Sequence, residues 1–153
     1  MNGVDIYSNY AIFVERVVMR NDMQLWIVEN LNDAVDAEFA ALPKDIQAKF
    51  LHLAELVEEV GLTSLHEPYI KHLQGKLWEL RVKGKTGLGR GLYCTICGRR
   101  VVVLRYFHKQ SCKTPQKEIA IALERLSQVP GCISESEINC LIENGEMEKI
   151  CNA

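Results

Sequence analysis

The chain has 153 residues, a formal net charge of −2 and 48% hydrophobic residues. This length fits one domain that buries a core without disulfides or metal, and the apolar content excludes global disorder. No apolar run approaches the roughly 20 residues that a membrane-spanning helix needs, and the start lacks the pattern of a signal peptide. We therefore expect the six cysteines to be reduced thiols in a cytoplasmic protein.

The positive charge is concentrated in one part of the chain. Residues 71–125 hold 13 Lys and Arg against 3 Asp and Glu, residues 1–70 hold 4 against 12, and residues 126–153 hold 1 against 5. This segregation suggests a polyanionic partner for the basic segment, with nucleic acid as the first candidate. The alternative is a solvated surface on which acidic helices pair with a basic sheet, and charge alone does not distinguish the two.

A strand and two helices are predicted first. Residues 24–29 have the pattern of a strand, whereas residues 1–22 give no clear assignment. Asn32 is the predicted cap of a helix that ends at Leu42. Pro43 opens a second helix that runs to Val60, because apolar residues recur every three or four positions and form one stripe. We expect this helical hairpin to pack across one face of a sheet.

The sheet itself is predicted from three strands, over residues 77–82, 89–96 and 100–107. Glycine turns between short β-rich runs indicate an antiparallel meander, and residues 62–75 before it are predicted to form a loop. Alternation along the first strand would place Trp78, Leu80 and Val82 beneath the helices. The same alternation would place Glu79 and Arg81 on an open, basic face.

The end of the chain is predicted to be helical. A polar loop over residues 108–114 leads to Pro115, which suits the first position of a helix that continues to about Leu126. Residues 127–153 then form an acidic extension with one short helix, capped near Ser134.

A metal site and a nucleophilic active site are both weakly supported. Cys94 and Cys97 have metal-ligand spacing, and His108 and Cys112 are the nearby residues that could complete a zinc site. Because Cys94 falls within a predicted strand, we expect thiols there and predict no metal and no cofactor. The chain also lacks a phosphate-binding glycine loop of standard spacing.

What remains is a set of cations interleaved with aromatic residues along the predicted sheet. Aromatic side chains on an open basic face could stack the bases of a single strand. For Trp78 the alternative is a place in the core, and for Arg81 and Arg90 it is a salt bridge to Glu79 or to a helix carboxylate. The cations are Lys76, Arg81, Lys83, Lys85, Arg90, Arg105, His108, Lys109 and Lys113, and the aromatic residues are Trp78, Tyr93, Tyr106 and Phe107.

The joint spacing of several motifs resembles the phage-derived, HigB-like branch of the RelE/ParE toxin superfamily. The motifs are Leu73-Gln-Gly-Lys-Leu-Trp-Glu-Leu-Arg81, Gly89-Arg-Gly-Leu-Tyr93, Phe107-His-Lys109, Lys113-Thr-Pro-Gln-Lys-Glu-Ile119 and the upstream Phe39-Ala-Ala-Leu-Pro43. The resemblance covers about residues 24–126. It divides the chain into an N-terminal extension (1–22), a toxin-like domain (23–126) and an acidic C-terminal extension (127–153).

The resemblance implies an α+β fold, with two N-terminal helices packed on a small twisted antiparallel sheet and followed by a C-terminal helix. It also implies a toxin that cleaves ribosome-bound mRNA and is paired with a helix-turn-helix antitoxin. By position, Arg81 and Arg90 match sheet arginines of the family, and Lys109 and Lys113 match lysines of the loop before the last helix. The sequence departs from the family's pattern at Gln110, Gly91 and Cys94.

Metal-independent cleavage by the RNA 2′-hydroxyl fits these residues. Arg90, and secondarily Arg81, would stabilise the charge that develops on the phosphate. Lys109 or His108 would act as acid or base, although His108 could equally be a loop residue that faces solvent. The remaining lysines of the site would bind substrate phosphates; they are Lys76, Lys83, Lys85 and Lys113.

Two other functions stay open from the sequence. Relatives of the ParE type inhibit DNA gyrase by protein contact, and a degenerate toxin would be an interaction module. Cleavage requires Arg81, Arg90 and Lys109 to converge, whereas gyrase binding does not.

Overall fold

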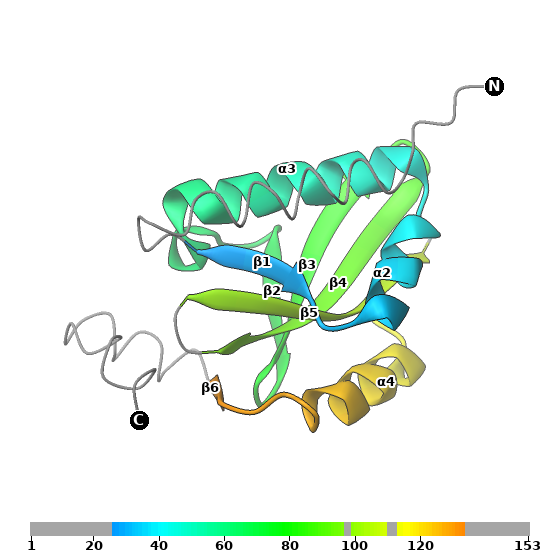
Figure 1. Ribbon diagram of the computed structural model, residues 1–153. Coiled ribbons are helices and arrows are strands. Elements are labelled where there is room, and N and C mark those ends of the chain that lie inside the picture. Colours follow the sequence, from blue (N-terminus) through cyan, green and yellow to red (C-terminus); the bar gives the residue numbers. More distant parts are fainter. Residues whose placement is uncertain (1–25, 97–98, 110–112, 134–153) are drawn as a thin grey trace.

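The computed structural model describes residues 26–96, 99–109 and 113–133, and these form a mixed α+β fold (Figure 1). A twisted sheet lies between two helices on one face and a third helix on the other. The helices are α2 (Asp33–Ala40), α3 (Lys44–Val60) and α4 (Gln116–Leu126), with the short 3-10 helix η2 (Leu62–Ser64). The strands are β1 (Ile27–Asn30), β2 (Ile70–Gln74), β3 (Leu77–Gly84), β4 (Gly87–Ile96), β5 (Arg100–Lys109) and β6 (Cys132–Ile133).

The predicted antiparallel meander is confirmed, but the sheet is larger and mixed. Its main strands follow the order β1-β5-β4-β3-β2. The pairs β2–β3, β3–β4 and β4–β5 are antiparallel. β1 instead pairs parallel with β5, which corrects the prediction of a purely antiparallel sheet. The chain passes through two helices and three strands between β1 and β5, so no tight turn dictates their relative direction.

Two boundaries of the sheet were predicted wrongly. Residues 70–74 form the edge strand β2, although the pattern predicted a loop. Only Ile70 of this strand is buried, so its sequence lacks the alternation that identifies a half-buried strand. His108 and Lys109 belong to β5, where they pair with Gly89 and Leu88, and not to the predicted loop.

The two N-terminal helices lie near their predicted positions, but α2 ends at Ala40, two residues before the predicted end at Leu42. The side chain of Asn32 accepts a hydrogen bond of 3.1 Å from the backbone N–H of Val35, which caps α2 as expected. The helix α3 starts after Pro43 and ends at Gly61, whose φ of 81° is accessible mainly to glycine.

Close packing of α3 on the sheet explains the glycine at position 89, near the start of β4. A Cβ atom added at Gly89 would lie 2.4 Å from Cγ2 of Ile46 and 2.9 Å from Cε2 of Phe50, both on α3. No side chain fits at this distance, so the absence of one allows the helix to approach the strand. The helix and sheet therefore meet most tightly beside the hairpin that joins β3 and β4.

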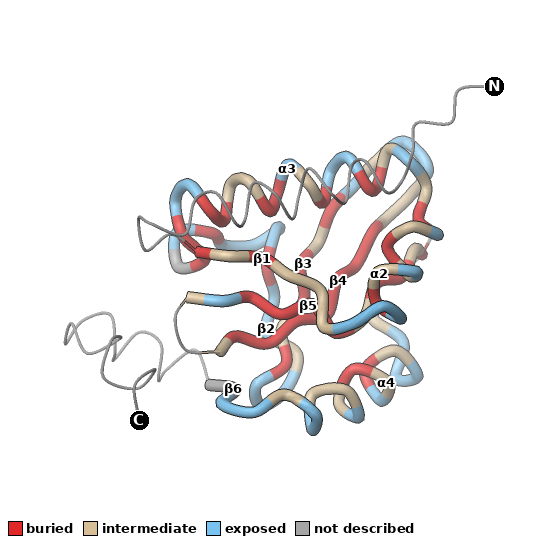
Figure 2. The backbone as a smooth tube through the Cα atoms, viewed as in Figure 1, coloured by how far each residue is buried: buried red, intermediate tan, exposed pale blue. Residues whose placement is uncertain are grey.

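The sheet is buried on both faces, as Figure 2 shows by the buried segments that run through its strands. The larger core lies between the sheet and α2 and α3, and it includes Leu80 and Val82, with Trp78 packed against it as predicted. A second core lies under α4 and contains Leu77, Leu92, Cys94, Val102, Leu104, Phe107, Ile119 and Ala122. The far face is thus covered and largely apolar, which corrects the prediction of an open basic face.

An ion-pair network fastens α4 to α2 across β5. Arg105 Nε lies 2.6 Å from Glu118 of α4, and its Nη1 contacts Glu38 of α2. Arg125 of α4 reaches the same Glu38 at 2.8 Å and donates to the carbonyl of Leu104 at 2.7 Å. Burial opposes the charge of Arg105, but the hydrogen bonds that it donates to both carboxylates outweigh this effect and raise its pKa.

The bulge in β5 explains how Arg105 joins this network. Leu92 of β4 pairs with Arg105 and Tyr93 pairs with Val103, so Leu104 is an extra residue. Its insertion brings Leu104 into the second core while Arg105, the next residue, turns toward Glu118. Strand alternation did not predict this arrangement, because the extra residue of a bulge changes which sheet face the following side chains point to.

The segment after α4 returns to the sheet. β6 pairs antiparallel with the end of β4, with Thr95 opposite Ile133 and Ile96 opposite Cys132. The first part of the predicted C-terminal extension therefore joins the fold.

No helix in the described residues is long and apolar enough to cross a membrane. The predicted start of the first strand at Gln24, the reversal at residues 97–98 and the helix near Ser134 lie outside the described residues.

Candidate functional site

A buried carboxylate holds two arginines side by side on the sheet. Arg81 of β3 and Arg90 of β4 are direct register partners, and Glu79 precedes Arg81 by two residues on the same face. Oε1 of Glu79 lies 3.0 Å from Nε of Arg81 and 3.7 Å from Nε of Arg90. The salt-bridge alternative for both arginines is therefore confirmed, with Glu79 as the shared partner.

The three charged side chains of this cluster are largely buried. Glu79 is fully buried, and the side chains of Arg81 and Arg90 are 19% and 5% exposed. Charges in such a place are tolerated only when they are paired and hydrogen-bonded. The hydroxyl of Thr114 donates to Oε2 of Glu79, which ties the segment before α4 to the same carboxylate. Glu79 was not predicted as part of the site, although its place two residues before Arg81 in the sequence was a usable signal.

Lys109 lies on the same face of the sheet as the arginines. Phe107 pairs with Arg90, and Lys109 follows two residues later, opposite Leu88. Its Nζ atom lies 5.9 Å from the centre of the Phe107 ring, within the range of a cation–π contact, and the residue is 9% exposed. The register thus brings Arg81, Arg90 and Lys109 to one face near the end of the β3–β4 hairpin.

His108 is separated from this cluster by strand alternation. Its neighbour Tyr106 belongs to the core under α2 and α3, and His108 points to that same side. One ring nitrogen lies 2.9 Å from the carbonyl oxygen of Thr86 in the β3–β4 turn. His108 is therefore half-buried and contacts the turn, which contradicts the alternative that it is a loop residue facing solvent.

The same turn is anchored to the start of α3. The backbone N–H and hydroxyl of Thr86 donate to the Asp45 carboxylate at 3.0 Å and 2.7 Å. These hydrogen bonds, first the one from the Thr86 backbone, lower the pKa of Asp45. The turn at Lys85 and Thr86 is consequently fixed by contacts from α3 and β5.

The four predicted substrate lysines are all exposed but do not gather in one place. Lys83 and Lys85 lie at the β3–β4 hairpin, and Lys113 lies beside Thr114. Lys76 lies in the turn between β2 and β3, at the opposite end of β3 from Lys83. Only the hairpin lysines are therefore close to the paired arginines along the strand.

A groove of about 660 Å³ adjoins the arginines. It is walled by α3, by the segment before β2 and by β3 and β4. Its lining contains five basic side chains, and no Asp or Glu among the described residues. The lining residues are Lys49, His52, Leu53, Leu56, Pro68, Tyr69, Arg81, Val82, Lys83, Leu88 and Arg90.

The α3 wall of this groove was missed by the sequence reasoning. Lys49, His52, Leu53 and Leu56 follow the spacing i, i+3, i+4 and i+7, so they form one stripe of α3. The periodicity was visible, but the leucines were assigned to the core alone. Their place in the lining depends on the packing of α3 against β3 and β4, which the sequence does not display.

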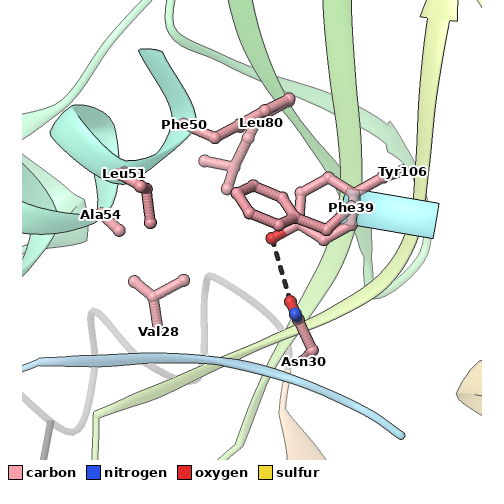
Figure 3. Close-up of a pocket in the computed structure, with 8 residues that line it drawn as sticks. All are labelled: Val28, Asn30, Phe39, Phe50, Leu51, Ala54, Leu80 and Tyr106. Carbon is pink, nitrogen blue, oxygen red and sulfur yellow. Dashed lines mark hydrogen bonds between the residues drawn. The ribbon is translucent and has the colours of Figure 1, made fainter. Parts of the chain in front are cut away.

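A second cavity lies in the larger core and is a packing feature. Figure 3 shows its lining from β1, α2, α3, β3 and β5, with the Tyr106 hydroxyl directed at Asn30. The hydroxyl donates to Asn30 Oδ1 at 3.0 Å. The space of about 20 Å³ accommodates about one water molecule and no larger ligand.

Within the described residues, no group of three or more His, Cys, Asp and Glu side chains could hold a metal ion. Cys94 is buried in the second core, and the other members of the weak zinc pattern, Cys97 and Cys112, lie outside the described residues.

The comparisons with known proteins identify a family. No curated protein matches the chain. Residues 37–127 match the family described as Phage derived protein Gp49-like (DUF891). The match runs from within α2 to the end of α4 and includes every residue that lines the groove. The chain therefore belongs to the phage-derived Gp49-like family (DUF891), a RelE/HigB-like toxin family.

Proposed function

We propose that the protein is the toxin of a toxin–antitoxin pair and that it cleaves ribosome-bound mRNA. The observation that carries this proposal is the pairing of Arg81 with Arg90 among the residues that line a groove with five basic residues and, in the described part of the chain, no Asp or Glu. Two adjacent guanidinium groups can bind several oxygens of one phosphate, and their charge persists at every physiological pH. Family membership supports the same class of activity.

In the proposed reaction the 2′-hydroxyl of the RNA attacks the adjacent phosphorus and the bond to the 5′-oxygen of the next nucleotide breaks. The products are a 2′,3′-cyclic phosphate and a free 5′-hydroxyl, so atoms balance without any cofactor. Arg81, the more exposed of the pair, contacts the phosphate, and Arg90, its neighbour on β4, adds positive charge. Glu79 holds both side chains in place.

Proton transfer is assigned to Lys109 in this proposal. Lys109 shares the face of the arginines, whereas His108 lies on the other face and is bonded to the Thr86 carbonyl. Lys83, Lys85 and Lys113 are proposed to bind flanking phosphates. Lys76, at the far end of β3, is the weakest candidate of the four.

The proposed partners are the mRNA in the ribosomal A site and a small antitoxin, of the helix-turn-helix type by the family resemblance. Both place the action of the protein in the cytoplasm, where translation occurs. An inhibitor of DNA gyrase is the competing function, and the experiment below separates it from the nuclease.

The test is induction of the wild-type chain and of Arg81→Gln in a bacterial host, followed by mapping of RNA 5′ ends. Arg81 is preferable to Arg90 as the test position, because it is more exposed and its substitution should destabilise the fold less. Lys117→Gln, an exposed change on α4 away from the groove, is the matched charge control.

New cuts within translated messages are expected for the wild type and for Lys117→Gln, and few or none for Arg81→Gln. Growth arrest with intact messages would refute the nuclease proposal and favour gyrase. A thermal melt of each purified variant establishes that the comparison is made between folded proteins.

A further inference from the structure

Tyr69 is an exposed aromatic residue at the rim of the groove. It is 49% exposed, and among the described residues only it and Val60 are large hydrophobic residues classed as exposed. The Tyr69 backbone is nevertheless fixed. Its carbonyl accepts a hydrogen bond of 2.8 Å from the N–H of Arg81, and its N–H donates to the carbonyl of His66 at 3.0 Å. The Tyr69 backbone is thus fixed next to that of Arg81, while the residue is half exposed, lines the groove and does not belong to the core.

The groove combines apolar and cationic lining. Leu53, Leu56, Pro68, Val82 and Leu88 contribute apolar surface along with the Tyr69 ring. The cations come from α3, β3 and β4, and Glu79 neutralises part of the charge of the two arginines. A surface of this mixed kind is complementary to a ligand that has both a flat apolar part and a negative charge.

An unpaired nucleotide has these two parts. Its base has a flat apolar face that stacks on aromatic rings, and its phosphate is recognised by guanidinium groups. The groove volume of about 660 Å³ is within the range of small-molecule sites and is large enough for a nucleotide. The groove therefore matches a nucleotide in charge, in its apolar surface and in size.

We propose that Tyr69 is the stacking platform of a base subsite, in which one unpaired base of an RNA strand lies on the Tyr69 ring while its phosphate lies at Arg81 and Arg90. The proposal rests on the proposed function and assigns Tyr69 the role of a binding residue. The rim lysines Lys49 and Lys83 contact the phosphates of neighbouring nucleotides. Stacking of this kind is tolerant of base identity, since every base has a π-face.

The test uses the full chain and a fluorescently labelled single-stranded RNA of about 12 nucleotides, within the usual span of such sites. Methylation of every 2′-hydroxyl makes the RNA resistant to the proposed cleavage, so binding is measured alone. Fluorescence anisotropy at low ionic strength gives the dissociation constant for wild type, Tyr69→Ala and Tyr69→Phe. His66→Ala, an exposed change in the same segment that does not line the groove, is the control.

We expect Tyr69→Ala to weaken binding by about 5- to 100-fold, and Tyr69→Phe to remain within about 2-fold of the wild type, because the phenyl ring still stacks. His66→Ala should bind as the wild type does. A probe whose bases are all replaced by abasic sites should bind wild type and Tyr69→Ala equally, which separates stacking from a change in the fold.

Equal binding of the base-containing probe by wild type and Tyr69→Ala would overturn the subsite, and so would the absence of any RNA binding by the wild type. The nuclease proposal fails separately, when messages stay intact in the induced cells. Tyr69-dependent binding together with intact messages would keep the subsite and remove the cleavage reaction.

Discussion

Neutralising the buried carboxylate in Glu79→Gln should destabilise the fold strongly. The substitution preserves the size of the side chain but leaves Arg81 and Arg90 as neighbouring like charges on one sheet face. Removing one member of a buried ion pair costs about 3–5 kcal/mol. Because the Arg81 side chain is 19% exposed and keeps some contact with water, we expect a loss of about 3 kcal/mol in the free energy of unfolding.

The measurement is chemical and thermal unfolding followed by circular dichroism. A loss of about 3 kcal/mol corresponds to a decrease of roughly 6–12 °C in Tm for a chain of this size. Glu124→Gln on the exposed side of α4 is the matched control and should change stability by less than about 0.5 kcal/mol.

A double variant separates charge from packing. Glu79→Leu combined with Arg90→Met replaces the pair by apolar side chains within the second core. Its loss of stability should be smaller than the sum of the two single losses, because Glu79 and Arg90 are removed together and only Arg81, which is 19% exposed, loses its carboxylate partner. A loss below about 1 kcal/mol for Glu79→Gln would show that the carboxylate is not the anchor of the arginines.

The remaining predictions concern the scaffold around the site. Glu38→Gln should lower the unfolding free energy by about 1–2 kcal/mol in a urea titration, because it weakens the ion-pair network that joins α2 to α4. The loss stays moderate because Glu38 is 15% exposed and water screens part of the interaction. Because the pKa of Asp45 is lowered in the folded protein, its ionised carboxylate stabilises the fold at pH values above its ordinary pKa of 3.8. This stabilisation is lost as the pH falls through the lowered pKa. The stability gap between wild type and Thr86→Val should therefore narrow below about pH 3.8, and a gap that widens with acid would contradict this linkage. Gly89→Ala should cost about 1–3 kcal/mol by overpacking, and Gly91→Ala clearly less, because the nearest atom to an added Cβ is 2.4 Å away at the first and 3.3 Å at the second.

The helices, and the strands from Leu77 to Phe107, were predictable because their signals are local. The stripe of α3 and the cap at Asn32 depend on periodicity and on one side chain, which the sequence displays directly. The edge strand β2 was missed because an exposed edge needs no alternation, and its assignment depends on pairing with β3. The parallel partner of β1 lies about 70 residues further along the chain, beyond any local pattern.

The candidate site was predictable in its residues but not in its environment. Arg81 and Arg90 were identified from the sequence, and their pairing through Glu79 was one of the alternatives left open. The covered far face was not predicted, because burial of Glu79 depends on α4 folding back over the sheet. His108 was assigned to a loop because the apolar run of β5 ends at Phe107, whereas the strand continues for two more residues. Its place in the strand sets the direction of the His108 side chain. The places of the α3 residues and of Tyr69 in the groove depend on packing between segments that are distant in the sequence, so local patterns did not predict them.

The central claim, that the groove beside Arg81 cleaves mRNA on the ribosome, is tested most directly with purified components. Ribosomes carrying an end-labelled mRNA are mixed with the wild-type chain, with Arg81→Gln or with Lys117→Gln, and the fragments are analysed. The account predicts fragments with 5′-hydroxyl ends from wild type and Lys117→Gln, loss of cleavage with Arg81→Gln, and no cut next to a 2′-deoxy nucleotide. Intact mRNA with the folded wild-type chain, or cleavage that is unchanged by the 2′-deoxy substitution, would contradict it.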